Sequence, residues 1–180
     1  GGVGFFELAE AFIHAGFVAV DVDMNDLMTG KVNLNEYSIL AVSGGSSYGD
    51  ALSPGAMWAK KIIKLPELRQ QFVKFFERKD TLVFGVGNGA QMLMVVHQEL
   101  VSDTLWPKCL PNRSGHFESR LACVRIEEGD SPWLNGMHEQ IIALPVACRY
   151  GSLKYDRRAD VRGLNLDNAA MRFVNNEGSY

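Results

Sequence analysis

The stretch that most constrains the fold runs from Thr81 to Met92 and reads T-L-V-F-G-V-G-N-G-A-Q-M. Residues Thr81 to Val86 are almost continuously apolar, which is typical of a parallel strand covered by helices on both faces. A Gly-x-Gly-x-Gly turn follows, and Asn88 to Leu100 has helical periodicity. A strand that turns sharply into a helix predicts an α/β domain with a candidate site at the turn.

The glycine turn has two interpretations. Turns of this kind hold a nucleophile in a strained conformation and direct backbone N–H groups at an oxyanion. Glycine-rich turns before a helix also cradle phosphates. A dinucleotide-binding fingerprint is not met, because Ala90 and Met92 stand where its third glycine is required.

The rest of the chain alternates helical and strand patterns. We expect helices over Phe5–Gly16, from Pro66 onward and over Asn88–Leu100, and strands over Phe17–Val22, Tyr37–Val42, Thr81–Val86, Leu121–Ile126 and Gln140–Cys148. This order predicts one domain over residues 1–180, of class α/β, with a doubly wound, mostly parallel sheet. Such a sheet normally opens with a strand, whereas here a helix comes first. Either the domain begins with this helix, or a first strand lies upstream of Gly1.

Composition excludes several classes of protein. A hydrophobic fraction of 47% and a net charge of -3 exclude a disordered chain. With 18 Lys and Arg against 21 Asp and Glu, we expect no nucleic-acid binding. The printed sequence has no apolar run long enough for a membrane span, and we expect no signal peptide, because the segment from Gly1 to Gly4 lacks a basic region. Its three cysteines form no CxxC pair, which favours a reducing, cytoplasmic location without a zinc site.

Several segments together resemble the class I glutamine amidotransferase domain of formylglycinamide ribonucleotide amidotransferase, also called phosphoribosylformylglycinamidine synthase. That family's turn reads G-V-C-N-G-C-Q-M, against G-V-G-N-G-A-Q-M in residues 85–92 here. Its G-G-F-S-Y-G-D turn resembles residues 44–50, and its N-x-S-x-x-F-E-[AS]-R segment resembles residues 112–120. Residues 7–12 and Trp106-Pro107 also match in order.

The resemblance implies a flavodoxin-like fold and a purine-biosynthetic activity in which glutamine is hydrolysed and ammonia passes to an ATP-dependent synthetase. It implies a synthetase domain in the same, much longer polypeptide as partner, L-glutamine as ligand, and ATP and Mg²⁺ only in the synthetase part. The oxyanion and glutamine-binding positions that it implies are Gly45, Ser46, Ser47, Tyr48, Gly49, Asp50, Asn88, Gly89 and Gln91. An ordinary strand-to-helix loop remains the alternative for residues 43–50.

The departures from the family pattern concern the catalytic residues. Gly87 stands where the family has its nucleophilic cysteine, and Ala90 replaces the second cysteine. Residues 150–153 read Y-G-S-L where the family has H-G-E-G, and Tyr180 precedes the family's P-H-P-E segment. The expected fold therefore lacks its first strand and its C-terminal catalytic segment. Because glycine offers no thiolate, we expect no catalytic residue and no glutaminase activity.

A second interpretation assigns no enzyme activity. Gammaherpesviruses carry tegument proteins similar to the same synthase, which as a family have lost the amidotransferase chemistry and bind host nuclear antiviral factors. That interpretation implies a host protein partner and a location in the virion tegument and host nucleus. An intact or a degenerate synthetase domain upstream distinguishes the two.

Overall fold

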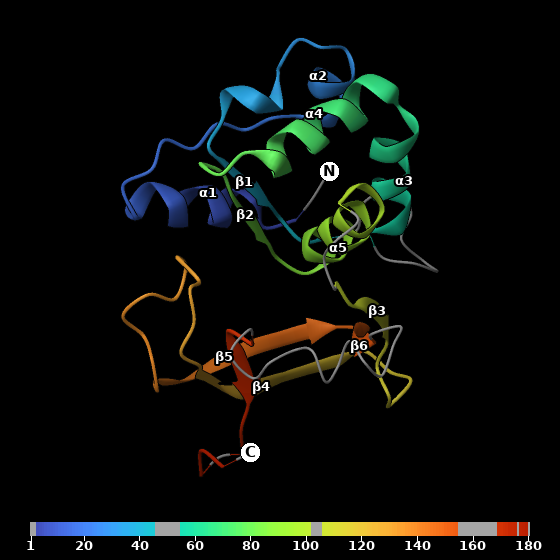
Figure 1. Ribbon diagram of the computed structural model, residues 1–180. Helices are drawn as coiled ribbons and strands as arrows, with labels where there is room; N and C mark the ends of the chain where they lie inside the picture. Colours follow the sequence, from blue (N-terminus) through green and yellow to red (C-terminus); the bar gives the residue numbers. More distant parts are fainter. Residues whose placement is uncertain (1–2, 46–54, 102–105, 155–168, 176, 180) are drawn as a thin grey trace. The chain divides into compact units, whose positions relative to one another are not determined.

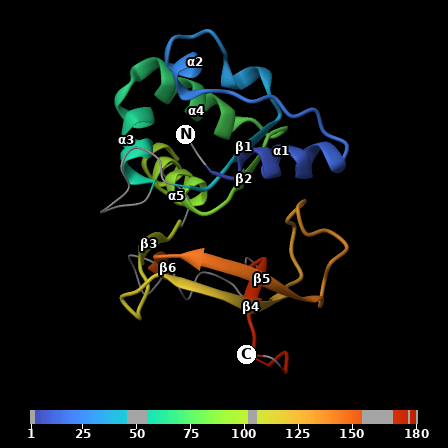
Figure 2. The same cartoon turned by 180° about the vertical axis from the view of Figure 1, so that it is seen from behind.

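The structure is a computed structural model that describes residues 3–45, 55–101, 106–154, 169–175 and 177–179. The chain divides into two compact units, residues 1–108 and 109–180 (Figures 1 and 2). The first unit carries the helices and a parallel strand pair, and the second is built from strands. No helix in the described ranges is long and apolar enough to cross a membrane.

The first unit is a helix-rich α/β unit. Its described elements, in chain order, are α1 Phe5–His14, α2 Met24–Met28, the 3-10 helix η1 Leu34–Glu36, β1 Ile39–Val42, α3 Ala56–Lys64, α4 Pro66–Glu77, β2 Leu82–Gly85 and α5 Asn88–Leu100. Strands β1 and β2 pair in parallel, with Ile39 opposite Leu82 and Val42 opposite Gly85. The predicted helix after the glycine turn is confirmed with the bounds that its periodicity indicated.

Helices cover both faces of this strand pair. The ring of Phe84 in β2 lies 5.8 Å from that of Phe12 in α1. Its neighbour Val83 instead lines a cavity together with Leu93 of α5. Because successive strand residues point to opposite faces, α1 and α5 lie on opposite sides of β2. This is the doubly wound arrangement that the sequence predicts.

The core of the first unit lies among α3, α4 and α5. Its most deeply buried side chains, each at most 2% exposed, are Ala59, Ile62, Leu68, Phe72, Phe75, Met92 and Val96. The apolar stripe predicted on the helix from Pro66 therefore faces the core, and Pro66 occupies the first turn as its missing N–H allows. Helix α5 is thus packed into this core.

The strand predicted over Phe17–Val22 is wrong. These residues pair with no strand in the described part of the chain, and Val18 is 92% exposed. An apolar segment becomes a strand only beside a hydrogen-bonding neighbour, and the described β1 pairs with β2 alone. Helix α1 likewise has no buried residue, so this side of the unit presents apolar surface.

The second unit is antiparallel. Its described strands are β3 Lys108–Pro111, which starts at the last residue of the first unit, β4 Glu118–Ile126, β5 Ile141–Cys148, β6 Tyr150–Lys154 and β7 Met171–Phe173. Strand β4 pairs antiparallel with β5 and β7, and β3 pairs with β6. The α/β class is confirmed, with a parallel strand pair in the first unit and an antiparallel three-stranded sheet, β5-β4-β7, in the second. A parallel crossover needs a helix, and the connection between β4 and β5 contains none.

Candidate functional site

The glycine turn between β2 and α5 is a sharp elbow. Gly87 has φ 51° and ψ −119°, a conformation that residues with a Cβ rarely adopt. Helix α5 starts at once: the Gly89 amide donates to the Val86 carbonyl at 2.9 Å, and the Gln91 amide donates to the Gly87 carbonyl at 3.2 Å. The strand–turn–helix predicted from the sequence is present, with the backbone angles of a nucleophile position.

Two further glycines let the elbow pack closely. A Cβ on Gly89 would lie 2.5 Å from the carbonyl oxygens of Val42 and Ser43. A Cβ on Gly85 would lie 2.8 Å from the Cα of Ala90. Only glycine fits these positions, so α5 begins directly against the end of β1.

The N-terminal loop completes the site. The Val3 amide donates to the Gly44 carbonyl at 3.0 Å, and a Cβ on Gly87 would lie 3.6 Å from the Gly44 Cα. Three turns therefore meet at the carboxyl ends of the two parallel strands, where open α/β sheets bind their ligands. Sequence reasoning missed Val3, since no local pattern marks a contact between segments this far apart.

The predicted glutamine-binding positions fall into two groups. Asn88, Gly89 and Gln91 are buried in the first turn of α5, and the two polar side chains are each 8% exposed. Gly45 has φ 95°, and a Cβ there would collide with the Val3 backbone. The structure thus brings these four residues to one place. The remaining predicted residues lie outside the described part of the chain: Ser46, Ser47, Tyr48, Gly49 and Asp50.

The elbow offers no nucleophilic side chain at position 87, and the Gly89, Ala90 and Gln91 amides donate to the carbonyls of Val86 and Gly87. His14, the last residue of α1, is exposed and donates its Nδ1–H to the Glu10 carbonyl at 2.8 Å. His97 lies ten residues after Gly87 on α5, or about 15 Å along the helix axis. In the described part of the first unit, no histidine is therefore placed to activate a group at position 87.

The three cysteines belong to the second unit, and all are half-buried free thiols. Cys109 lies in β3 and donates its Sγ–H to the Tyr150 carbonyl at 3.2 Å. Burial, and to a lesser extent the nearby Cys148 thiol, raises the pKa of Cys109, so the unreactive protonated form is favoured. No group of three or more metal-ligating side chains occurs within the described ranges.

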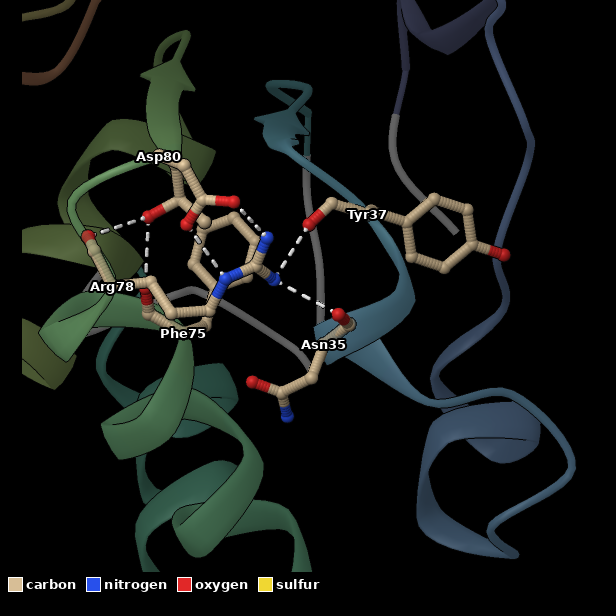
Figure 3. Close-up of polar contacts among 6 residues, drawn as sticks. Asn35, Tyr37, Phe75, Arg78 and Asp80 are labelled. Carbon is tan, nitrogen blue, oxygen red and sulfur yellow. Dashed lines mark hydrogen bonds and ion pairs between the residues drawn. The ribbon is translucent and has the colours of Figure 1, made fainter.

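A polar network aligns the strands that carry the elbow (Figure 3). The Arg78 guanidinium donates to both carboxylate oxygens of Asp80 at 2.9 and 2.8 Å. Its Nη1 donates to the carbonyls of Asn35 and Tyr37 at 2.8 and 3.0 Å. The pair raises the pKa of Arg78 and lowers that of Asp80. Arg78 therefore ties the segment before β1 to the segment before β2.

These features define a class of protein: an α/β domain whose parallel strand turns through a positive-φ elbow into a buried helix, as in nucleophile-elbow enzymes. The family model of the CobB/CobQ-like glutamine amidotransferase domain matches residues 1–180, and the chain belongs to that family. The match confirms the resemblance to glutamine amidotransferases that the sequence motifs indicate.

A solved structure shares the fold. The structure of PurLQS from Thermotoga maritima contains a chain that aligns with a TM-score of 0.68 and 24% sequence identity. The alignment covers 99% of this chain and 79% of that chain. It confirms the mixed α/β architecture.

Proposed function

We propose that this chain is the glutaminase-like domain of a phosphoribosylformylglycinamidine synthase relative and that it has lost its own glutaminase chemistry. The observation that carries the proposal is Gly87 at the elbow, where the backbone keeps the conformation of a nucleophile position and the side chain is absent. Without a thiol, no glutamyl thioester forms. What remains is the fold, with a positive-φ turn directly before α5.

The proposed partner is an ATP-dependent synthetase component. Similarity to a chain of PurLQS supports this partner, as do the motifs outside the elbow that resemble the synthase. ATP and Mg²⁺ would belong to the synthetase part and not to this domain. L-glutamine is the ligand that the buried Asn88 and Gln91 would contact, and the cytoplasm is the proposed location.

A glutaminase assay on the chain and on Gly87→Cys tests the proposal. We expect no ammonia release from either protein, because no histidine lies beside the elbow in the described part of the first unit. The added Cβ has room, since it would lie 3.6 Å from the Gly44 Cα. Gly87→Ser is the matched control, because it introduces the same backbone strain without a thiol.

Each outcome is informative. Glutaminase turnover by the unaltered chain would show that another group attacks glutamine and would overturn the proposed loss of activity. Turnover by Gly87→Cys but not by Gly87→Ser would show that only the thiol was lost and that the rest of the site is intact. Inactivity of the unaltered chain, Gly87→Cys and Gly87→Ser supports the proposal that catalytic groups besides the thiol are also absent.

A non-enzymatic binding protein, such as a tegument protein derived from the same synthase, is the second candidate. The same observation favours it, because a domain that acts by binding a host protein does not need a side chain at position 87. Sequencing the complete gene distinguishes the two. Intact ATP-binding residues in a synthetase domain support the first candidate, and their loss supports the second.

A further inference from the structure

A cavity of about 150 Å³ lies in the first unit, away from the elbow. Its lining residues come from α4, β2, α5, the connection between α4 and β2, and the segment after α5; they are Phe76, Arg78, Thr81, Val83, Leu93, His97 and Trp106. Helix α5 contributes to both places, with its first turn at the elbow and its last turns at the cavity. The glutaminase-like motif uses no residue of this cavity.

One wall of the cavity is aromatic. The His97 ring stacks on Trp106 with centroids 4.7 Å apart and planes inclined by 29°. The Phe76 ring also lies 5.1 Å from that of His97. The aliphatic side chains of Val83 and Leu93 also line the cavity. Such a surface favours a flat ring that packs against ring faces and edges.

The Thr81 hydroxyl and the Arg78 guanidinium at the cavity are already engaged by the protein. The Thr81 hydroxyl bonds to the Phe75 and Arg78 carbonyls at 2.8 and 3.2 Å. The charge of Arg78 is matched by the bidentate contact with Asp80. A carboxylate or phosphate ligand would have to compete with Asp80, whereas a neutral ring leaves these bonds intact.

The volume fits one ring. An engineered protein cavity of about 150 Å³, lined by aliphatic and aromatic side chains, binds benzene. We propose that this cavity binds a small, neutral, monocyclic aromatic molecule. Binding at this cavity uses no residue of the elbow, so its test does not depend on whether the proposed function is correct.

Methyl NMR on the full chain tests this binding, with phenol as the probe and cyclohexanol as the non-aromatic control of similar size. Phenol is expected to shift the Val83 and Leu93 methyl signals saturably and to leave those of the core residue Ile62 unchanged. Ring packing should make phenol bind roughly two- to tenfold more tightly than cyclohexanol. Non-saturating shifts, shifts spread over the core, or equal affinity for the two compounds would overturn the proposal.

A cavity-filling variant gives a second readout. Val83→Phe places a ring inside the cavity and is expected to abolish the saturable shift at Leu93. Met57→Phe, at a position 50% exposed on α3, is the control and should bind phenol like the unaltered chain. A folded Val83→Phe variant that still binds phenol would contradict the assignment of the site. If that variant does not fold, the pattern of shifts in the unaltered chain decides alone.

Discussion

Individual residues hold the elbow in place, and the residue at its centre has no side chain. Gly87 keeps φ 51°, a conformation that costs a residue with a side chain on the order of 1–3 kcal/mol. In an active amidotransferase that strain is borne by the nucleophile; here glycine adopts the angles without a Cβ clash. The geometry of the site therefore persists although no thiol requires it.

A substitution of Arg78 tests whether its polar network stabilises the pairing of β1 with β2. Arg78→Lys is expected to lower the thermal midpoint by a few degrees, because one ammonium cannot reach Asp80 and the carbonyls of Asn35 and Tyr37 together. Asp80→Asn is the control. It removes the ion pair but leaves both hydrogen bonds from Arg78 to the carbonyls, so the thermal midpoint should fall less than in Arg78→Lys. Equal midpoints for Arg78→Lys and the unaltered chain would show that the network does not support the fold.

At the scale of elements, the contact between α5 and β1 sets the position of the elbow. It is close because Gly89 has no Cβ, and the helix begins against the carbonyls of Val42 and Ser43. Helix propensity alone favours alanine over glycine at a helical position by roughly 0.5–1 kcal/mol. The presence of glycine at position 89 is therefore explained by close packing against β1 and not by helix propensity.

Gly89→Ala should therefore destabilise the chain despite the better helix former. We expect a loss of about 1–3 kcal/mol in urea unfolding, the usual range for overpacking. Gly44→Ala is the matched control in the same site, since its Cβ would meet the Val86 carbonyl at an ordinary 3.4 Å. A gain of stability in Gly89→Ala would mean that α5 shifts freely and that the contact does not fix the elbow.

At the scale of the whole molecule, stability becomes dependent on pH through His97. Burial lowers the pKa of this half-buried ring, which stacks on Trp106 and shares its cavity with Arg78. The unfolded chain, with a histidine pKa of about 6.5, then binds a proton more readily than the folded chain. The stabilisation is complete above that value and is lost as the pH falls through it toward the lowered folded pKa.

Thermal unfolding between about pH 8 and pH 5 measures this effect. The midpoint of the unaltered chain should fall over the acidic half of the range, and His97→Gln should show a flatter profile. His14→Gln, which changes an exposed ring on α1, is the control and should keep the original slope. An unchanged slope in His97→Gln would assign the pH dependence to other groups.

The sequence by itself determined the local parts of this protein. The apolar run before Gly87 and the periodicity of residues 88–100 predict β2 and α5, because both patterns depend on neighbours along the chain. The loss of the nucleophile also follows from one residue type, since no arrangement of the fold gives glycine a thiol. The resemblance of several motifs was enough to indicate the family.

Only the tertiary structure decided which segments became neighbours. Phe17–Val22 has a strand-like sequence but no strand beside it in the described part of the chain, so residues 17–21 stay exposed and only Val22 packs against the core. The second unit is antiparallel because no crossover helix joins β4 to β5, and the contact between Val3 and Gly44 forms across the fold. Strand pairing and cavities depend on contacts between residues that are distant in the chain. The periodicity of a segment does not specify which distant segment will lie beside it.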